Sequence, residues 1–519
     1  MASGPTSSTK NSLGSKPVGS APEVQDRHTL VADSIATGVV FALILTVGQR
    51  AIGFVRGLLF CRFMNEQQLG QWSLVWSFLM LLVPFAVLGL PGCFGKYTEH
   101  YRQRGQLGYF VKRIALFSGG LTLVAATSML AMPATFSQIV LGSPEFTGIV
   151  YAMAFCLVMV SFSNIMVSLL ESLRQVRMVT LMRFLVGILF STVGLAMVVC
   201  FENAAIGATV GFGICSLIGV IPAFWLLRKI RTAIVNDGEV LGHSQMWTRV
   251  APFAAWLWIS NFLNNCFELS DRLMLLNCSP VSSEAAQGLV GQYHSGRTIP
   301  LMLISLAAIL GGMLLPYLAA YWEKDERDKA CNQLRWSLKL MALVFTAVGV
   351  CMLITAPFIF DTILQGRYDE GLAVLPMTLV YCIWFGLYTV GQDYMWVAEK
   401  GKFTALALLG GLLLNLLLNW LLIPSMGVSG AVLATTISNA FLVTVVYVFN
   451  HWLGCKSDFG IWFCALVPLI LLLPVHFSII ASVLIAIAGW KTGVIFRAEE
   501  KQEVADSVAK LAKKFGGRS

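Results

Sequence analysis

Polar side chains that could bind an anion stand inside an apolar stretch near the start of the chain. Residues 35–60 form one apolar run, in which Gln49 and Arg50 lie well inside and Arg56 follows six residues later. A charge deep in a membrane costs about 2.5–3.5 kcal/mol on insertion scales, so it is retained for a function or for a buried partner. Planar guanidinium groups bind phosphate oxygens in pairs. Arg50 and Arg56, with Gln49, are therefore predicted to line a cavity for a pyrophosphate; the alternative for each arginine is a structural pair.

A second polar group lies in the run 250–276. Glu268 and Asp271 occur there, followed directly by Arg272, and Asp393 lies in a later run. A desolvated carboxylate responds strongly to nearby cations, so Glu268, Asp271 and Asp393 are candidates to carry a coupling proton or sodium ion. The alternative is a structural ion pair of Glu268 or Asp271 with Arg272.

One further cation is expected at the same cavity. Arg297 lies in the run 289–319, with His294 just before it.

Metal sites are not indicated, because the 12 cysteines are scattered and form no CxxC motif. Neither a disulfide framework nor a zinc site is predicted.

The elements that position these residues must be membrane helices. Of 519 residues, 57% are hydrophobic and only 12% are charged, whereas a soluble domain has about 25% charged residues. Apolar runs of about 20 residues cross the hydrocarbon core, and backbone groups there are satisfied within a helix. Composition thus excludes a soluble enzyme and predicts an all-α polytopic membrane protein. The net charge of +9 is distributed over short loops, so membrane lipids, and no nucleic acid, are the expected partners.

Apolar windows predict about fourteen transmembrane helices. Lysine and arginine concentrate in the loops after every second window, whereas the other loops carry only Arg62, Arg272 and Arg367. Because cytoplasmic loops retain positive charge, both termini are predicted to be cytoplasmic. The windows lie near 35–60, 71–94, 110–132, 147–170, 178–201, 204–227, 250–276, 289–319, 334–359, 373–397, 403–423, 429–450, 460–475 and 477–494.

An internal repeat predicts two halves. Residues 68–72 (QLGQW) resemble residues 289–293 (LVGQY), and Pro91 matches Pro316, at a common offset of about 223 residues. Since each half holds six helices, the halves are predicted to be parallel, related by a pseudo-two-fold axis, with a cleft between them for alternating access. The alternative is a duplicated scaffold that only packs.

The predicted organisation has six parts. They are a disordered cytoplasmic tail (1–29), an N-terminal six-helix half (30–228), a cytoplasmic linker (229–248), a C-terminal six-helix half (249–455), a terminal helix pair (456–494) and a basic amphipathic cytoplasmic tail (495–519).

Several short motifs follow one another along residues 33–450. They are Arg50 to Arg62 running into Leu69–Ser73, then Asp271–Arg272, Gly291–Tyr293, Gly366–Tyr368, Asn415 to Asn419, Leu422–Pro424 and Gly427–Thr435. In this order they resemble the polysaccharide flippases of the multidrug/oligosaccharidyl-lipid/polysaccharide exporter superfamily, in particular bacterial O-antigen flippases.

That resemblance implies a flippase and not an enzyme. Its substrate would be a polyprenyl-pyrophosphate-linked oligosaccharide, a precursor of lipopolysaccharide or exopolysaccharide, carried across the bacterial cytoplasmic (inner) membrane. In related flippases, arginines of the first helix line a cationic cavity, which carries over to Arg50 and Arg56. The implied partners are the lipid-linked oligosaccharide, membrane lipids, a polysaccharide polymerase and glycosyltransferases; no cofactor is implied beyond coupling by H⁺ or Na⁺.

Other functions remain open on the sequence. A multidrug exporter of the same superfamily would require an acidic cavity to bind cationic drugs. A lipid II flippase would share the cationic cavity. A membrane glycosyltransferase or polymerase would need a large outer loop or catalytic domain, and a scaffold would need no cavity arginines.

Overall fold

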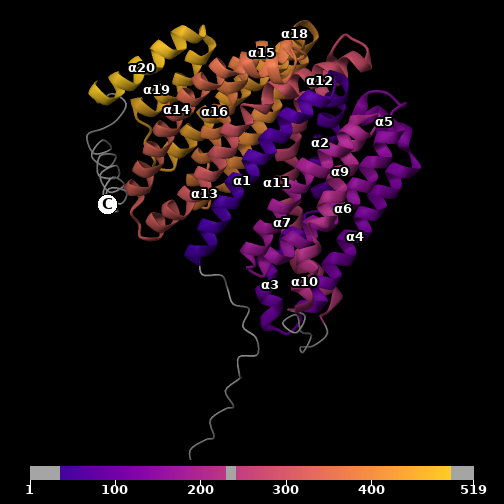
Figure 1. The fold of residues 1–519 in the computed structure, drawn as a ribbon. Coiled ribbons are helices and arrows are strands. Elements are labelled where there is room, and N and C mark those ends of the chain that lie inside the picture. Colours follow the sequence, from indigo (N-terminus) through magenta and orange to yellow (C-terminus); the bar gives the residue numbers. More distant parts are fainter. Residues whose placement is uncertain (1–34, 230–240, 493–519) are drawn as a thin grey trace, which may run out of the picture.

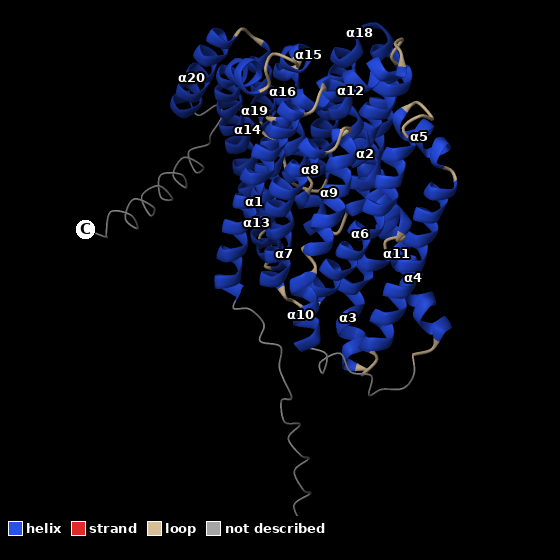
Figure 2. Ribbon diagram, turned by 45° about the vertical axis from the view of Figure 1, so that its right-hand side comes forward, coloured by secondary structure: helices blue, strands red, loops and turns tan. Residues whose placement is uncertain are grey.

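Every regular element in the described part of the chain is helical. The computed structural model describes residues 35–229 and 241–492. Most of its long helices run side by side, whereas α20 lies at an angle to them (Figures 1 and 2). Apolar runs become helices because hydrocarbon offers no partner for an unpaired backbone group. The all-α prediction is confirmed, whereas the predicted tails 1–29 and 495–519 lie outside the described residues.

The first elements belong to the predicted N-terminal half. They are α1 (Ile35–Phe63), α2 (Glu66–Ala86), η1 (Leu90–Gly92), α3 (Cys93–Gln103), α4 (Leu107–Ala131), α5 (Pro133–Leu141), α6 (Thr147–Ser172), α7 (Val176–Leu189), η2 (Phe190–Gly194), α8 (Leu195–Cys200), α9 (Ala204–Ile218) and α10 (Ile221–Lys229).

The later elements form the predicted C-terminal half and terminal pair. They are α11 (His243–Cys278), α12 (Ser283–Thr298), α13 (Leu301–Glu323), α14 (Arg327–Phe358), η4 (Ile359–Ile363), α15 (Asp369–Ala373), α16 (Leu375–Gly391), α17 (Asp393–Val397), α18 (Gly401–Trp452), α19 (Phe459–Leu466), η5 (Val467–Leu472) and α20 (Val475–Thr492).

The predicted domain boundaries stay predictions. Helix α11 begins at His243, within the range 229–248 that was assigned to the linker. Met246 and Val250 are buried against the core formed by α3 and α4, and this packing extends the helix into the expected linker.

Within the described residues, nine helices are long and apolar enough to cross a membrane. One of them, α18, is broken at Gly427, where φ is 54° and ψ is −127°. This positive φ strains any residue with a side chain, so glycine suits the break. The two parts of α18 lie side by side, since Asn415 and Thr435 are hydrogen-bonded at 3.3 Å, and they match the predicted runs 403–423 and 429–450. The total of fourteen spans stays a prediction.

The two halves touch through backbone where α2 crosses α12 (Figure 1). A Cβ atom added to Gly70 would lie 1.8 Å from the carbonyl oxygen of Gln287, and one added to Gly291 would lie 2.0 Å from that of Glu66. Gly70 and Gly291 are the positions that the predicted repeat matches. Small residues allow helices to approach this closely in a membrane. The end of the molecule that holds this crossing is here called the closed end.

Hydrogen bonds from the later half also hold the end of α1 at the closed end. The Tyr368 hydroxyl lies 3.0 Å from the carbonyl oxygens of both Cys61 and Met64. Arg62 donates to the carbonyl oxygen of Ile363 at 2.9 Å. The opposite end carries the segments that follow α3, α6, α13 and α17, which include Arg104, Arg174, Lys324 and Lys400, and is here called the basic end.

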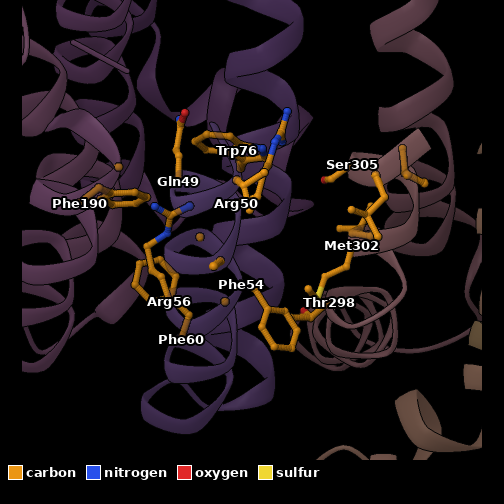
Figure 3. A pocket seen from close by; sticks show the side chains of 18 of the residues that line it. Gln49, Arg50, Phe54, Arg56, Phe60, Trp76, Phe190, Thr298, Met302 and Ser305 are labelled. Carbon is orange, nitrogen blue, oxygen red and sulfur yellow. The ribbon is translucent and has the colours of Figure 1, made fainter. Parts of the chain in front are cut away.

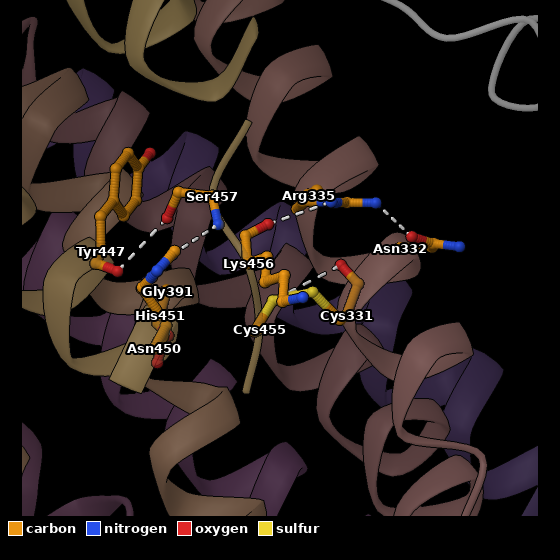
Figure 4. Close-up of a disulfide and its surroundings, with 10 residues drawn as sticks. All are labelled: Cys331, Asn332, Arg335, Gly391, Tyr447, Asn450, His451, Cys455, Lys456 and Ser457. Carbon is orange, nitrogen blue, oxygen red and sulfur yellow. Dashed lines mark hydrogen bonds between the residues drawn. A yellow bond between two sulfur atoms is a disulfide. The ribbon is translucent and has the colours of Figure 1, made fainter. Parts of the chain in front are cut away.

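A disulfide joins two distant segments at the basic end (Figure 4). Cys331 near the start of α14 is bonded to Cys455 just after α18, with Cα atoms 5.2 Å apart. Beside it, Arg335 donates to the carbonyl oxygen of Lys456 at 3.0 Å. The sequence predicts no disulfide framework and does not reveal this pair, because the two cysteines are separated by 124 positions in the sequence and only the folded helices bring them together.

Loss of this bond is expected to lower stability. Since the bond closes a long segment, Cys331→Ser should reduce the free energy of unfolding by about 2–4 kcal/mol. Thermal unfolding in detergent, followed by tryptophan fluorescence with and without reductant, measures the effect, and Cys351→Ser on the exposed side of α14 is the control. Reductant should shift the wild-type midpoint downward and leave Cys331→Ser unchanged; two free thiols in oxidised wild-type protein would contradict the bond. In a reducing compartment the pair is expected as two thiols.

Candidate functional site

A cavity of about 560 Å³ lies between the two halves, with its wall shared by α1, α2, α7, α12 and α13. Gln49, Arg50 and Arg56 reach it from α1, and Thr298 and Ser305 face them from the other half (Figure 3). The structure thus brings together three of the residues predicted to bind an anion. Their binding role stays a prediction.

Helix α1 presents its polar residues to the cavity because it packs closely on α7. At Gly187 a Cβ atom would lie only 3.2 Å from the side chain of Gln49. Arg56 is partly buried and its guanidinium carbon lies 4.5 Å from the centre of the Phe190 ring. Such cation–π stacking holds the guanidinium in place without neutralising its charge, while Arg50 is exposed in the cavity.

The cavity is positively charged. No aspartate or glutamate occurs among its described lining residues. Likewise, no described carboxylate forms an ion pair with Arg50 or Arg56. Cations that converge in a cleft with low-dielectric walls focus the field and attract anions.

Aromatic rings form the wall beside Arg56. Phe60 and Phe190 pack edge to face with centroids 5.5 Å apart, and Trp72 lies 5.8 Å from each. Trp76 continues this wall toward Phe212. The wall combines flat apolar surfaces with nearby cations, a combination that suits a ligand with both sugar rings and an anionic group.

A polar link leads from the cavity into the C-terminal half. Ser73 of α2 accepts a hydrogen bond from Arg272 Nε at 2.8 Å, and its hydroxyl lies 3.0 Å from His294 Nδ1. His294 lines the cavity, whereas Arg272 is buried. Both side chains cross from the later half to the earlier one, so Ser73 contributes to the contact between the halves.

Arg297 does not line this cavity. Its Nη2 atom lies 3.4 Å from both carboxylate oxygens of Glu268, and the guanidinium lies over the ring of Tyr293. Arg272 Nη1 is 3.6 Å from the same carboxylate. The structure therefore places Arg297 beside Glu268 and Arg272 and not among the residues that line the Arg50–Arg56 cavity, and a binding role for Arg297 stays a prediction. For Glu268 the structure has the ion pair that the sequence left as an alternative.

Asp271 has a different environment, although it lies on the next turn of α11. It is 3% exposed. Its Oδ1 accepts hydrogen bonds from Asn415 at 3.0 Å and Asn419 at 2.8 Å, and its Oδ2 accepts from Thr435 at 2.7 Å and from Tyr293. These donors are neutral, and among the described residues Asp271 has no ion pair with Arg272.

Asp393, the third acidic candidate, lies apart from both groups. It begins α17 and packs against α13, where a Cβ atom on Gly311 would lie 3.1 Å from its Oδ2. Within the described residues this oxygen is buried and has no hydrogen-bond partner. The three acidic candidates therefore do not form one cluster.

Sequence reasoning did not select several residues of the cavity wall. They are Trp72, Trp76, Phe190, Thr298 and Ser305. Trp72 belongs to the repeated motif at residues 68–72, which provided a usable signal. Phe190 provided none, since one phenylalanine in an apolar run resembles any other.

The chain matches a family model described as "Polysaccharide biosynthesis protein" over residues 35–322. It belongs to this family. One relative of this chain is the lipid II flippase MurJ of Bacillus subtilis. The two are 22% identical over 473 residues, and the match covers 84% of this chain and 85% of MurJ.

Solved structures of other proteins have the same fold as this chain. MurJ in its inward closed conformation has a TM-score of 0.66 and 14% identity, covering 88% of this chain and 99% of that one. An inward-facing multidrug resistance MATE family transporter of the MOP superfamily has a TM-score of 0.65 and 10% identity, covering 80% and 97%. Since these proteins have membrane transporter folds, the prediction of a multi-pass membrane protein with a transporter fold is confirmed.

Proposed function

We propose that this protein moves a polyprenyl-pyrophosphate-linked oligosaccharide across the bacterial cytoplasmic membrane by alternating access. The observation that carries the proposal is the cavity between the halves, in which Arg50 and Arg56 have no described acidic partner. A pyrophosphate and sugars cannot cross hydrocarbon unaided, because desolvating their charges and hydroxyl groups is too costly. The arginines of a cationic cleft can form hydrogen bonds that replace those which the pyrophosphate loses with water.

The direction of the molecule follows from its charged loops. Cytoplasmic loops are enriched in lysine and arginine, so we propose that the basic end faces the cytoplasm and that both termini are cytoplasmic. The α2–α12 crossing then closes the outer side, and the described conformation receives substrate from the inner leaflet. Release requires the crossing at Gly70 and Gly291 to open.

Lipid II is the second candidate substrate. It shares the polyprenyl-pyrophosphate linkage, and the similarity to the lipid II flippase MurJ extends over most of both chains. Organic cations are a poorer fit: they would meet two arginines and no described carboxylate in the cavity wall. Glycosyltransferases that assemble the oligosaccharide and a polymerase that uses it are the proposed neighbours in the membrane.

Sealed proteoliposomes test this function. A fluorescent polyprenyl-pyrophosphate oligosaccharide is followed from one leaflet to the other, with empty vesicles as the baseline and lipid II as a competing substrate. Exchange above baseline supports the proposal, and a preference for lipid II would reassign the substrate. Absence of exchange under any ion gradient, with gradient-driven export of an organic cation, would establish the multidrug alternative.

We propose that Asp271, and not Glu268 or Asp393, binds the coupling proton or sodium ion. Glu268 is already paired with two arginines. A buried carboxylate with only neutral donors gains most from an arriving proton or sodium ion. Asn415 and Asn419 present oxygen to a cation after rotation of their amides, and the described Asn419 Oδ1 is buried without a partner. The same ion would draw α11, α12 and both parts of α18 together.

Asp271→Asn is expected to abolish the response to an ion gradient. The change preserves shape while removing the charge, and coupling energies of about 1–3 kcal/mol predict that stimulation by the gradient falls about 5- to 150-fold. Exchange is measured with and without imposed sodium and proton gradients. Asp393→Asn is the matched control and should retain stimulation. Full stimulation in Asp271→Asn would rule out this residue as the coupling site.

A further inference from the structure

Two side chains of the later half meet at one hydroxyl group of the earlier half. Ser73 of α2 is fully buried, and it accepts a hydrogen bond from Arg272 Nε of α11 at 2.8 Å. The same hydroxyl oxygen lies 3.0 Å from His294 Nδ1 of α12. A serine hydroxyl can accept one hydrogen bond while it donates another. Ser73 therefore ties α2 to two helices of the other half through a single side chain.

This junction lies beside the backbone contact at the closed end. Ser73 follows Gly70 by three positions on α2, and His294 follows Gly291 by three positions on α12. Residues three positions apart are neighbours on one face of a helix, and the two glycines let α2 and α12 approach closely. The hydrogen bonds at Ser73 must therefore break when these helices part.

The arginine that donates to Ser73 directly follows Asp271 on α11. Its guanidinium is held on the same helix, because Arg272 Nη1 donates to the carbonyl oxygen of Glu268 at 2.6 Å and lies 3.6 Å from the Glu268 carboxylate. These contacts leave Nε directed at Ser73. A displacement of α11 at Asp271 therefore also displaces the donor to Ser73.

The histidine is connected to Asp271 as well. Tyr293, which directly precedes His294 on α12, donates to Asp271 Oδ2. Asp271 and Tyr293 thus stand one residue before the two partners of Ser73 on their helices. Successive helical residues are only about 1.5 Å apart along the axis. The contact of Asp271 with α12 and the two contacts at Ser73 are therefore expected to change together.

We propose that Ser73 is a positioning residue that makes closure of the closed end depend on the Asp271 carboxylate. While this carboxylate holds α11 against α12, both partners of Ser73 stay in place and α2 is held to the later half. When the contacts of the carboxylate are lost, the hydrogen bonds at Ser73 are lost with them. The inference rests on the proposed function, because alternating access requires this end to open.

A double-mutant cycle tests this coupling without any transport step. The reporter is a thiol introduced by Gln71→Cys at a buried position of the closed end. Its labelling by a maleimide is followed in the purified full-length protein by mass spectrometry of the labelled peptide. The reporter protein is compared with Ser73→Ala, with Asp271→Asn and with both changes together.

The two single changes are each expected to raise the labelling rate about tenfold. Ser73→Ala removes the hydroxyl, and Asp271→Asn replaces a carboxylate oxygen that accepts hydrogen bonds with an amide group that donates them. Residues in one hydrogen-bond network have non-additive effects, so the double variant should label no faster than either single variant. Two independent residues would instead give an increase of about a hundredfold.

Three further variants separate coupling from a general loss of packing. Ser77→Ala is the matched control, because Ser77 is also buried on α2 but donates within its own helix, to the Ser73 carbonyl oxygen at 2.9 Å. It should label at the reporter rate. Ser73→Thr retains a hydroxyl group and should restore slow labelling. His294→Ala removes the second partner of the same hydroxyl and should show the same non-additivity with Asp271→Asn.

Three results would overturn the inference. They are additive effects of Ser73→Ala and Asp271→Asn, unchanged labelling in Ser73→Ala, and equally fast labelling in Ser77→Ala and Ser73→Ala. The proposed function is judged separately by lipid exchange in proteoliposomes. A non-additive cycle in a protein that exchanges no lipid would support the coupling and contradict the proposed function.

Discussion

Replacing both Arg50 and Arg56 with alanine is expected to slow exchange of a polyprenyl-pyrophosphate oligosaccharide at least about a hundredfold. A hydrogen bond to a charged group contributes about 1.5–3 kcal/mol, and each guanidinium offers a planar fork to phosphate oxygens. Both side chains line one cavity and have no described acidic partner, so a bound anion would use both. The initial rate of exchange in sealed proteoliposomes measures the loss.

Conservative substitutions separate charge from geometry. Arg50→Lys and Arg56→Lys keep the positive charge and lose the fork, so intermediate rates are expected. Arg56→Lys also removes a planar group from the Phe190 ring. Arg183→Ala is the matched control, because Arg183 is about half exposed and pairs with Glu171 away from the cavity. A double alanine variant that exchanges at the wild-type rate would mean that these arginines do not bind the substrate.

Gly291→Val is expected to reduce exchange to the level of empty vesicles. A Cβ atom there would lie 2.0 Å from the backbone oxygen of Glu66, and backbone cannot yield as a flexible side chain can. The variant therefore favours a state in which α2 and α12 are apart. A shift of about 5.5 kcal/mol moves a two-state equilibrium from 1:99 to 99:1, and a transporter held in one state does not cycle.

Thiol labelling reports the same shift independently of transport. Gln71 is buried at the closed end, and its amide Nε2 donates to Gln287 Oε1 across the crossing at 2.9 Å. A Gln71→Cys thiol should be labelled slowly by an impermeant reagent, and rapidly when Gly291→Val is added. Gly312→Val is the matched control, since a Cβ atom at Gly312 meets open space. Wild-type exchange by Gly291→Val would contradict the closing role of this crossing.

The helices could be predicted from the sequence because backbone N–H and C=O groups in hydrocarbon must form hydrogen bonds within the segment itself. The apolar runs 403–423 and 429–450 are the two parts of α18, and the break falls at Gly427 between them. Contacts between distant segments could not be predicted in this way. Cys331 and Cys455 meet only because α14 and the end of α18 are neighbours in the folded bundle.

The residues of the candidate site could be predicted only in part, because some of them are identified by their depth in a span and others only by contacts between distant helices. Depth in a span identified Gln49, Arg50 and Arg56, because a polar residue far from both interfaces needs a wet or polar environment. Depth alone did not distinguish Arg297, whose environment is set by the carboxylate of Glu268 on another helix. The neutral donors around Asp271 come from α12 and α18, and their convergence depends on the fold of the whole C-terminal half.

The central claim is that an unpaired cationic cavity recognises the pyrophosphate of a lipid-linked sugar and carries it between leaflets. It is tested most directly by comparing exchange of two lipids that share one polyprenyl chain and one oligosaccharide and differ only in a pyrophosphate or an uncharged linkage. Wild-type protein should move the pyrophosphate lipid and leave the uncharged lipid at the baseline, and the Arg50→Ala, Arg56→Ala double variant should move neither. Equal exchange of both lipids by wild-type protein would contradict the account.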